Sequence, residues 1–325
     1  MGVVVVTDHV FPDLDVESRM LAAAGHELRF TGNVRTPAEV SAVAADADAI
    51  LNCYAPIPAE VIGSLTRCRV IARYGIGLDT IDIPAASARG ILVTNVPDYC
   101  IDEVSDHALA LILSLARRVV PLDRSVRAGG WDLAAARPLH RLRGRTLGLV
   151  GFGRIARRLA EKAAPIGFRV IAFDPYVPDD QMAAAGVEAG DLEAVLTQSD
   201  VVSVHAPLTQ ESRHLLGAGE LRSMKPGAIL VNTSRGPLVD LEALREVLTE
   251  GHLGGVALDV LETEPPEADD PLLRHPDVVI TPHAAFYSEE AMAEQQRKAA
   301  EQVVMALRGE IPTYAVNAGS LDTRR

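Results

Sequence analysis

Short apolar runs alternate along the chain with amphipathic segments of helical period. The runs in the first third are VVVV (3–6), AIL (49–51), VIARY (70–74) and ILVTN (91–95). A second series opens with TLGLVG and continues through RVIAFD, VVSVH, AILVNTS, GGVALDV and VVITPH. Runs that are apolar throughout and separated by helical segments are typical of parallel strands buried on both faces. The pattern therefore predicts an α/β protein with two series of parallel strands.

Two longer segments carry apolar residues at helical spacing. IDEVSDHALALILSLARRV predicts a long helix over 101–119, and SEEAMAEQQRKAAEQVVMALRG predicts another that ends at Gly309. Glycine is favoured just beyond the last turn of a helix because it adopts the left-handed conformation without strain. Between the first of these helices and the second strand series, RSVRAGGWDLAAARPLHRLRG follows neither period and is expected to be irregular.

Composition and charge limit the classes of partner. The 325 residues suffice for two domains, and a net charge of −13 without a basic stripe argues against direct nucleic-acid binding. No apolar run approaches the roughly 18 residues that indicate a membrane-spanning helix, and the start MGVVVVTDHVFPD has no signal-peptide character. Three cysteines without metal-ligand spacing indicate reduced thiols in a cytoplasmic protein with no bound metal.

The second strand series begins with a nucleotide-binding pattern. In LGLVGFGRIARRLA, Gly151, Gly153 and Ala156 have G-x-G-x-x-A spacing between a strand and a helix, with Arg154 and Ile155 inside the turn. Such a turn lets the backbone approach a pyrophosphate at the helix N-terminus. The next strand ends at Asp174, where a carboxylate is expected to bind the ribose hydroxyls and to repel a 2′-phosphate. We therefore expect NAD as the cofactor.

The position of this motif predicts the domain organisation. The cofactor domain is expected to begin near residue 101, so residues 1–100 are the candidate for the substrate domain. The last helix is expected to return to that first domain, because chain termini of a domain often lie close together. We therefore predict an NAD-binding domain over 101–283, inserted between the two parts, 1–100 and 284–325, of a substrate domain.

Charged residues follow three strands of the second series. Arg235 follows ILVNTS, Asp259 and then Glu264 follow GGVAL, and His283 follows VVITP. Open parallel sheets bind ligands at the carboxyl ends of their strands. A guanidinium polarises a carbonyl, a carboxylate beside an imidazole favours its charged form, and an imidazole gives or takes a proton. Taken singly, Arg235 and Glu264 could form surface ion pairs and His283 could be a core histidine; together with NAD they suit carbonyl reduction.

The motifs as a set resemble the D-isomer-specific 2-hydroxyacid dehydrogenase family over nearly the whole chain. The matching pieces are RYGIGLDTID, GFGRIA, FDPY, VNTSRGPLVD, ALDVLETEPP and TPHAA, in family order. The resemblance implies two doubly wound parallel-sheet domains, with a Rossmann NAD domain inserted into a flavodoxin-like substrate domain. It also implies a homodimer with a dimerisation arm near 120–143, and the catalytic trio Arg235, Glu264 and His283.

The resemblance implies further contacts. Cofactor-binding residues would be Gly151, Gly153, Arg154, Ile155, Asp174, His205, Ala206, Pro207, Thr233 and Asp259. Asp259 and Thr233 would hold the nicotinamide amide, and the backbone N–H groups of Gly75, Ile76 and Gly77 would bind a substrate carboxylate.

Three longer stretches, RYGIGLDTIDI, VPDYCIDEVSDHAL and TPHAAFYSEEA, show a narrower similarity to the branch that contains the C-terminal-binding-protein corepressors. In that branch Arg73 would contact the substrate carboxylate, while Tyr54 and Phe286 would line an apolar wall. The implied reaction is NAD-dependent interconversion of a small 2-oxo acid and its D-2-hydroxy acid. The alternative is an NAD(H)-sensing scaffold with little turnover. The loop LNCYAPIP has no cation for a substrate phosphate, and Glu264 argues against a formate dehydrogenase; phosphite stays open as a substrate, as does the choice of acid.

Overall fold

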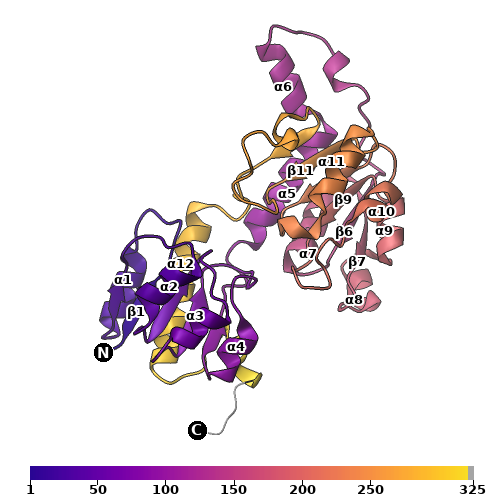
Figure 1. The fold of residues 1–325 in the computed structure, drawn as a ribbon. Coiled ribbons are helices and arrows are strands. Elements are labelled where there is room, and N and C mark those ends of the chain that lie inside the picture. The colour runs from indigo at the N-terminus through magenta and orange to yellow at the C-terminus, as the bar shows by residue number, and fades with distance from the viewer. Residues whose placement is uncertain (321–325) are drawn as a thin grey trace. The chain divides into compact units, whose positions relative to one another are not determined.

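The structure is a computed structural model that describes residues 1–320, apart from the side chain of Ala135. The chain forms two compact units, one of Met1–Tyr99 with Ser288–Arg325 and one of Cys100–Tyr287 (Figure 1). The second unit continues past residue 283, because Asp259 accepts hydrogen bonds from the backbone N–H groups of Ala284 and Ala285. The predicted fold class, two parallel-sheet α/β units, is confirmed.

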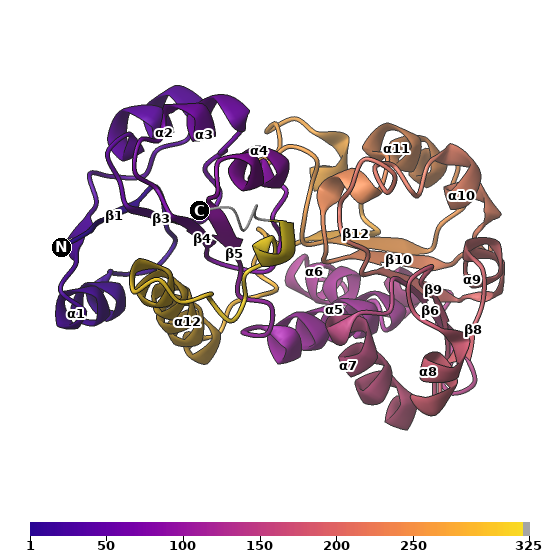
Figure 2. The ribbon, with the colours of Figure 1, turned by 90° about the horizontal axis from the view of Figure 1, so that it is seen from below.

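The first unit contains a five-stranded parallel sheet of order β2-β1-β3-β4-β5. Helices α2, α3 and α4 cover one face and helices α1 and α12 cover the other (Figure 2). The strands are β1 (Val3–Val6), β2 (Glu27–Arg29), β3 (Ala49–Asn52), β4 (Val70–Arg73) and β5 (Leu92–Thr94). The helices are α1 (Asp15–Ala23), α2 (Pro37–Ala44), α3 (Ala59–Ser64), α4 (Ile83–Ala88) and α12 (Glu289–Leu307). This strand order is the flavodoxin-like order that the resemblance implies.

The second unit contains a seven-stranded parallel sheet of order β12-β11-β10-β9-β6-β7-β8. The strands are β6 (Thr146–Val150), β7 (Arg169–Phe173), β8 (Glu188–Ala189), β9 (Val201–Val204), β10 (Ile229–Asn232), β11 (Gly255–Leu258) and β12 (Val278–Ile280). The order reverses between β6 and β9, as in a Rossmann fold, so loops on either side of β6 diverge and leave a ligand site at the carboxyl edge.

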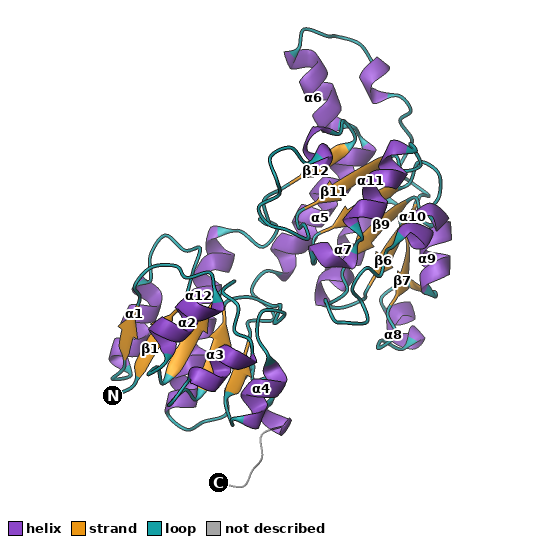
Figure 3. Ribbon diagram, in the orientation of Figure 1, coloured by secondary structure: helices purple, strands orange, loops and turns teal. Residues whose placement is uncertain are grey.

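Helices cover both faces of the second sheet (Figure 3). They are α5 (Ile101–Ala116), α6 (Val119–Arg127), α7 (Arg154–Ala163), α8 (Asp179–Ala184), α9 (Leu192–Gln198), α10 (Ala218–Ser223) and α11 (Leu241–Thr249). Short 3₁₀ turns are η1 (Ala134–Ala136), η2 (Ala164–Ile166), η3 (Gly236–Leu238), η4 (Pro271–Arg274) and, in the first unit, η5 (Ala318–Ser320). Within residues 1–320, no helix has the length and apolar character needed to cross a bilayer.

Strand register places the predicted cofactor residues on one edge of the second sheet. Val150 pairs with Phe173 on one side and with Val204 on the other, and Val204, Asn232, Leu258 and Ile280 continue the same row. The residues one position further along these strands are Asp174, Gly151, His205, Thr233, Asp259 and Thr281. Because parallel strands end at a common edge, residues from all parts of the unit meet there.

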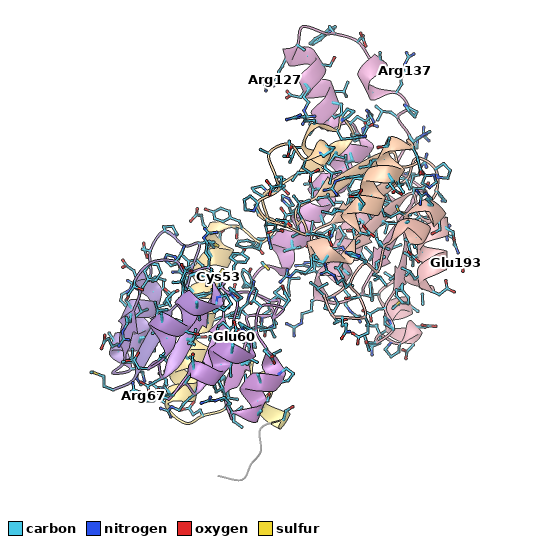
Figure 4. All side chains as sticks on the ribbon, viewed as in Figure 1. Cys53, Glu60, Arg67, Arg127, Arg137 and Glu193 are labelled. Carbon is cyan, nitrogen blue, oxygen red and sulfur yellow. The ribbon has the colours of Figure 1, made fainter. Side chains whose placement is uncertain are left out.

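The segment between α5 and β6 differs from the prediction. The long helix predicted over 101–119 ends at Ala116, because Arg118 is left-handed, with a φ of 50°. The stretch predicted as an irregular arm over 120–143 begins with helix α6, which has no buried residue. This arm projects from the rest of the unit in Figure 1, and Figure 4 labels Arg127 and Arg137 on it. Trp131 and Leu133 of the arm are 88% and 67% exposed.

Candidate functional site

The glycine-rich turn lies between β6 and α7, as predicted. Gly151 has a φ of 92°, and a Cβ there would lie 2.7 Å from the backbone N of Ala206. Only glycine therefore allows the turn to pack against the loop after β9. A Cβ at Gly153 would meet no atom within 4 Å, so the backbone at the start of α7 is open to an approaching group. Arg154 and Ile155 form the first residues of α7.

Asp174, at the end of β7, lies beside this turn. Its Oδ2 accepts a hydrogen bond from the Phe152 N–H at 2.8 Å, and its Oδ1 accepts one from the Tyr176 N–H at 2.9 Å. Each carboxylate oxygen has a second lone pair for another donor. Asp174, Tyr176 and Asp191 are among the residues that line a cavity of about 530 Å³. The turn and this cavity fit the phosphates and adenosine of a dinucleotide.

The loop after β9 holds a neutral histidine. His205 is within 2.9 Å of the Ser203 hydroxyl through its Nε2, and burial lowers its pKa to about 4. Ala206 and Pro207 follow it and lie against Gly151 through the backbone of Ala206. Thr233, at the end of β10, is buried, and its hydroxyl has no hydrogen-bond partner among the described residues. A buried hydroxyl without a partner suits a polar group of a bound ligand.

His283 and Glu264 form a direct pair. His283 Nδ1 lies 2.8 Å from Glu264 Oε2, and Glu264 Oε1 accepts a hydrogen bond from the Leu261 N–H at 2.9 Å. His283 has a left-handed backbone, with a φ of 51°, and its side chain is 24% exposed. The ring of Phe286 lies edge-on to the imidazole, with 6.2 Å between ring centres. The imidazole is therefore held through Nδ1 by a carboxylate.

The electrostatics of the pair favour a charged carboxylate. Burial by itself would raise the pKa of Glu264. The hydrogen bond and the charge of His283, the Leu261 N–H and the charge of Arg235 together outweigh burial, so the pKa of Glu264 is lowered. Glu264 is therefore an ionised carboxylate at the Nδ1 side of the imidazole.

Arg235 belongs to the same unit and acts on Glu264 through its charge. Its Nη1 donates to the Ser234 carbonyl at 2.8 Å, and its own carbonyl accepts from the Asn232 side chain at 2.8 Å. The following residue, Gly236, packs directly on the backbone of Leu261, where a Cβ would lie 2.0 Å from the carbonyl carbon. This contact joins the Arg235 loop to the loop that carries Glu264. Sequence reasoning missed Gly236, whose signal is its place within the NTSRGPLVD motif.

Asp259 is more enclosed than the sequence suggests. Its carboxylate is 2% exposed and accepts bonds from the Thr281 hydroxyl and the Ala284 N–H through Oδ1 and from the Ala285 N–H through Oδ2. The hydroxyl of Thr281 in turn lies 3.0 Å from Nε2 of His107 on α5. Sequence reasoning missed His107 and Thr281, because the contact joins positions far apart in the chain.

Most of the predicted substrate residues lie in the first unit, namely Tyr54, Arg73, Gly75, Ile76 and Gly77, whereas Phe286 lies in the second. Arg73 ends β4, is 7% exposed and donates through Nε to the Cys53 carbonyl at 3.2 Å; its guanidinium lies 5.8 Å from the ring centre of Tyr54. The guanidinium also lies directly over Gly75, where a Cβ would come within 1.9 Å of Nη1. Ile76 and Gly77 continue this loop, and the Ile76 carbonyl accepts from the Asn95 side chain at 2.7 Å.

The loop after β3, which carries Tyr54, is held by a carboxylate. Asp8 accepts bonds from the backbone N–H groups of Cys53, Tyr54 and Ala55 at 3.0, 2.6 and 3.2 Å. Three converging N–H groups form an anion site, and here Asp8 fills it. Beside it lies a cavity of about 220 Å³ lined by Asp8, His9, Asn33, Arg35 and Tyr54 with their neighbours. The loop sequence itself contains no cation, but Arg35, from a different part of the chain, lines the same cavity.

Comparison with known proteins points in the same direction as the geometry. Residues 109–285 match the family model described as D-isomer specific 2-hydroxyacid dehydrogenase, NAD binding domain. A glyoxylate reductase of Korarchaeum cryptofilum is 44% identical over 277 residues, which cover 84% of this chain and 83% of that relative. A D-3-phosphoglycerate dehydrogenase of Archaeoglobus fulgidus is 39% identical over 82% of this chain, but the match spans only 50% of its own length.

Two solved structures are similar to this chain over nearly its whole length. The TT0316 protein of Thermus thermophilus has a TM-score of 0.86 and 36% identity, with 97% of this chain and 99% of that chain covered. The D-lactate dehydrogenase of Aquifex aeolicus, solved with NAD and lactic acid, has a TM-score of 0.85 and 27% identity, with 95% and 96% covered.

Proposed function

This chain belongs to the D-isomer specific 2-hydroxyacid dehydrogenase family, and we propose that it interconverts a small, unphosphorylated 2-oxo acid and its D-2-hydroxy acid. It is an NAD-dependent oxidoreductase of that family. The observation that carries the proposal is the 2.8 Å hydrogen bond between His283 and Glu264 in the unit that matches the NAD-binding domain. That pair supplies the proton that carbonyl reduction requires.

Reduction needs a hydride at the carbonyl carbon and a proton on the oxygen. NADH, when bound, supplies the hydride. The protonated His283 gives its Nε2 proton to the oxygen, while the guanidinium of Arg235 stabilises the negative charge that develops there. Glu264 holds Nδ1 and favours the charged ring between turnovers. In the oxidative direction, neutral His283 takes the proton from the alcohol.

The carboxyl edge of the second sheet would hold the cofactor. Gly151 and Gly153 would admit the pyrophosphate to the start of α7, beside Arg154 and Ile155. Asp174, which lines the adjoining cavity, would accept bonds from the ribose hydroxyls. His205, Ala206 and Pro207 would lie along the adenosine half. The hydroxyl of Thr233, buried without a partner among the described residues, would bond the nicotinamide amide, with Asp259 beside it.

The substrate carboxylate binds in the first unit. Arg73 is buried, and no carboxylate among residues 1–320 forms an ion pair with it. A buried guanidinium without a counter-ion is costly, and an anionic substrate removes that cost. The backbone N–H groups of Gly75, Ile76 and Gly77 assist, and Tyr54 contacts the apolar tail. Because Asp8 already fills the N–H cluster of the neighbouring loop, a substrate phosphate would meet a carboxylate there.

A substrate panel tests the proposal. The purified protein is mixed with NADH and with glyoxylate, pyruvate, 2-oxobutyrate, hydroxypyruvate or 3-phosphohydroxypyruvate, and the loss of NADH absorbance is followed. We expect turnover of unphosphorylated acids and a much lower kcat/KM for the phosphorylated acid. Preference for 3-phosphohydroxypyruvate over hydroxypyruvate would contradict the assigned substrate class. Arg35 would then be the candidate cation for the substrate phosphate.

The same panel separates an enzyme from a scaffold. The alternative, an NAD(H)-sensing protein of the corepressor type, is not favoured, because the relatives reported above are named reductases and dehydrogenases. Tight NADH binding without turnover of any acid in the panel would favour the scaffold instead.

The arm is the surface on which a second copy is proposed to dock, giving a homodimer. Val119, Val126, Trp131 and Leu133 expose 47–88% of their surface on this one segment, and clustered apolar residues of this kind mark association sites. Light scattering after gel filtration should give a dimer mass for the wild type and a monomer mass for Trp131→Asp combined with Leu133→Asp. Ile311→Asp, at an equally exposed site in the first unit, is the control and should stay dimeric.

A cytoplasmic location is proposed from the thiols. Cys53 and Cys68 form no disulfide, and burial raises the pKa of each to about 12. Cysteines that stay unpaired are typical of reducing compartments.

A further inference from the structure

The backbone of His283 adopts a conformation that its residue type does not favour. Its φ is 51°, in the left-handed region, where the Cβ of any residue except glycine is crowded by the backbone. Pro282 precedes it, and Ala284 and Ala285 follow. Such a conformation persists only where the surrounding structure holds it in place.

Asp259 fixes the turn from two directions. Its carbonyl accepts the His283 N–H at 2.8 Å, and its carboxylate accepts the N–H groups of Ala284 and Ala285 at 2.9 Å each. Three successive backbone groups thus bond to one residue at the end of β11. Because the imidazole leaves the backbone in the middle of this turn, a small rotation of the turn displaces Nε2.

Thr281 and His107 orient the Asp259 carboxylate. A carboxylate only accepts, so the single proton of the Thr281 hydroxyl points to Asp259 Oδ1, 2.5 Å away. The hydroxyl oxygen must then accept from His107, whose Nε2 lies at 3.0 Å and therefore carries a proton. Direct contact of His107 with the carboxylate is weaker, since Nε2 is 3.6 Å from Oδ1. Donation therefore runs from His107 to Thr281 and from Thr281 to Asp259, and Asp259 also accepts from the backbone N–H groups of the turn.

We infer that His107 and Thr281 are positioning residues for the reaction, acting through Asp259 to hold the left-handed turn that aims His283. The expected effect on kcat rests on the proposed function of His283. The expected effect on the conformation of the turn does not depend on that function. It also gives Asp259 a role within the protein, in addition to the predicted contact with the nicotinamide. Helix α5 thereby connects to the proton donor through Thr281 and Asp259.

A double-mutant cycle tests the kinetic part. Thr281→Val removes the hydroxyl and keeps the shape, and we expect kcat to fall on the order of 10- to 100-fold while the Kd for NADH is maintained. In a His283→Ala background the same substitution should have no further effect on kcat. Thr281→Ser should restore most of the activity. An equal fold-loss in both backgrounds would assign Thr281 a general structural role and overturn the inference.

His107 gives a second pair of variants. Gln places an N–H donor near the Thr281 hydroxyl, whereas Phe places none, so His107→Gln should retain more kcat than His107→Phe. Thr197→Val is the matched control, because the Thr197 hydroxyl bonds only to its own helix, at the Glu193 carbonyl. Equal kcat for His107→Gln and His107→Phe would exclude a hydrogen-bonding role.

Hydrogen exchange tests the structural part without any turnover. In the protein without cofactor, Thr281→Val and His107→Phe should speed exchange of the Ala284 and Ala285 amides, and Thr197→Val should not. Unchanged exchange at these amides would overturn the inference whatever the activity. If the wild type reduces no 2-oxo acid and exchange still rises as expected, the proposed function fails while the positioning network stands.

Discussion

At the scale of single residues, three imidazoles of the second unit have different environments and therefore different chemistry. His205 is half-buried, and desolvation lowers its pKa to about 4, which keeps it neutral at physiological pH. His107 lies with its Nε2 3.0 Å from the Thr281 hydroxyl, to which it donates. Among these three, His283 alone bonds a carboxylate at hydrogen-bond distance, 2.8 Å, because Nε2 of His107 lies 3.6 Å from Asp259 Oδ1. Environment, more than residue type, thus selects His283 for proton transfer.

The pH dependence should follow from Glu264. Its lowered pKa means that the carboxylate contributes stability above its unfolded pKa and loses it as pH falls through the folded value. Across the neutral range Glu264 is therefore charged and favours the protonated His283. Reduction should fade as pH rises, and oxidation should fade as pH falls. Glu264→Gln removes the charge, so both limits should move to lower pH in pH–rate profiles; profiles that keep the wild-type position would refute this role.

Cofactor choice should depend on Asp174. Repulsion of a 2′-phosphate is expected to favour NADH over NADPH by roughly 5- to 150-fold, equivalent to about 1–3 kcal/mol. Asp174→Asn keeps an acceptor for the Phe152 or Tyr176 N–H but loses the charge. The ratio of NADH affinity to NADPH affinity should therefore be smaller in this variant than in the wild type. Fluorescence titration of both nucleotides with both proteins measures this. Equal affinities in the wild type would show that Asp174 does not contact the ribose.

Arg73 should control substrate binding. Loss of a charge-assisted hydrogen bond of about 1.5–3 kcal/mol predicts a KM about 10- to 150-fold higher in Arg73→Ala for any acid that the wild type reduces. Gly75→Ala should act in the same direction, because its Cβ would displace the guanidinium. Arg73→Lys retains the charge and should be less impaired. A KM that stays at the wild-type value in Arg73→Ala would place this residue outside the substrate site.

At the scale of elements, uniformly apolar runs were sufficient to predict most strands, and the exceptions have a physical reason. Strands β2 and β8 are missed because ELR and EA contain no apolar run and lie at sheet edges. Helix α6 is missed because it is short and none of its residues is buried against the sheet. The motifs indicated the trio and the glycine turn, but His107 and Thr281 are joined by a contact that only the fold creates.

A buried cluster joins α1, β4 and α12 in the first unit and should make stability depend on pH. Burial raises the pKa of Glu17, although the Tyr74 hydroxyl at 2.8 Å and the Gln296 amide at 3.0 Å offset part of that. A raised carboxyl pKa favours the protonated form in the folded state, so this contribution to stability is lost as pH rises through the raised value.

Tyr74→Phe tests this cluster. It removes one donor to the carboxylate, so it should cost about 1–3 kcal/mol, and the cost should grow as pH rises and Glu17 ionises. Denaturant unfolding at several pH values measures the effect. Tyr314→Phe, which removes a bond to Asp98 at 3.1 Å, is the control. A cost for Tyr74→Phe that is independent of pH would contradict the explanation.

At the scale of the whole molecule, the two units divide the proposed chemistry. The second unit holds the glycine turn, Asp174 and the His283–Glu264 pair, and the first holds Arg73 with its glycine-flanked loop. The chain passes from one to the other at Cys100 and returns at Ser288, whose hydroxyl caps α12 through the Ala291 N–H. The return places the proton donor only a few residues before a helix of the other unit.

The most direct test of the account is the reduction of a 2-oxo acid by His283→Ala, compared with the wild type. The variant should lose roughly 10²- to 10⁴-fold in kcat, the usual contribution of a general acid. Its Kd for NADH should stay near that of the wild type, because His283 is not among the residues proposed to hold the cofactor. If His283→Ala reduces the same acid at the wild-type rate, the proposed mechanism is wrong.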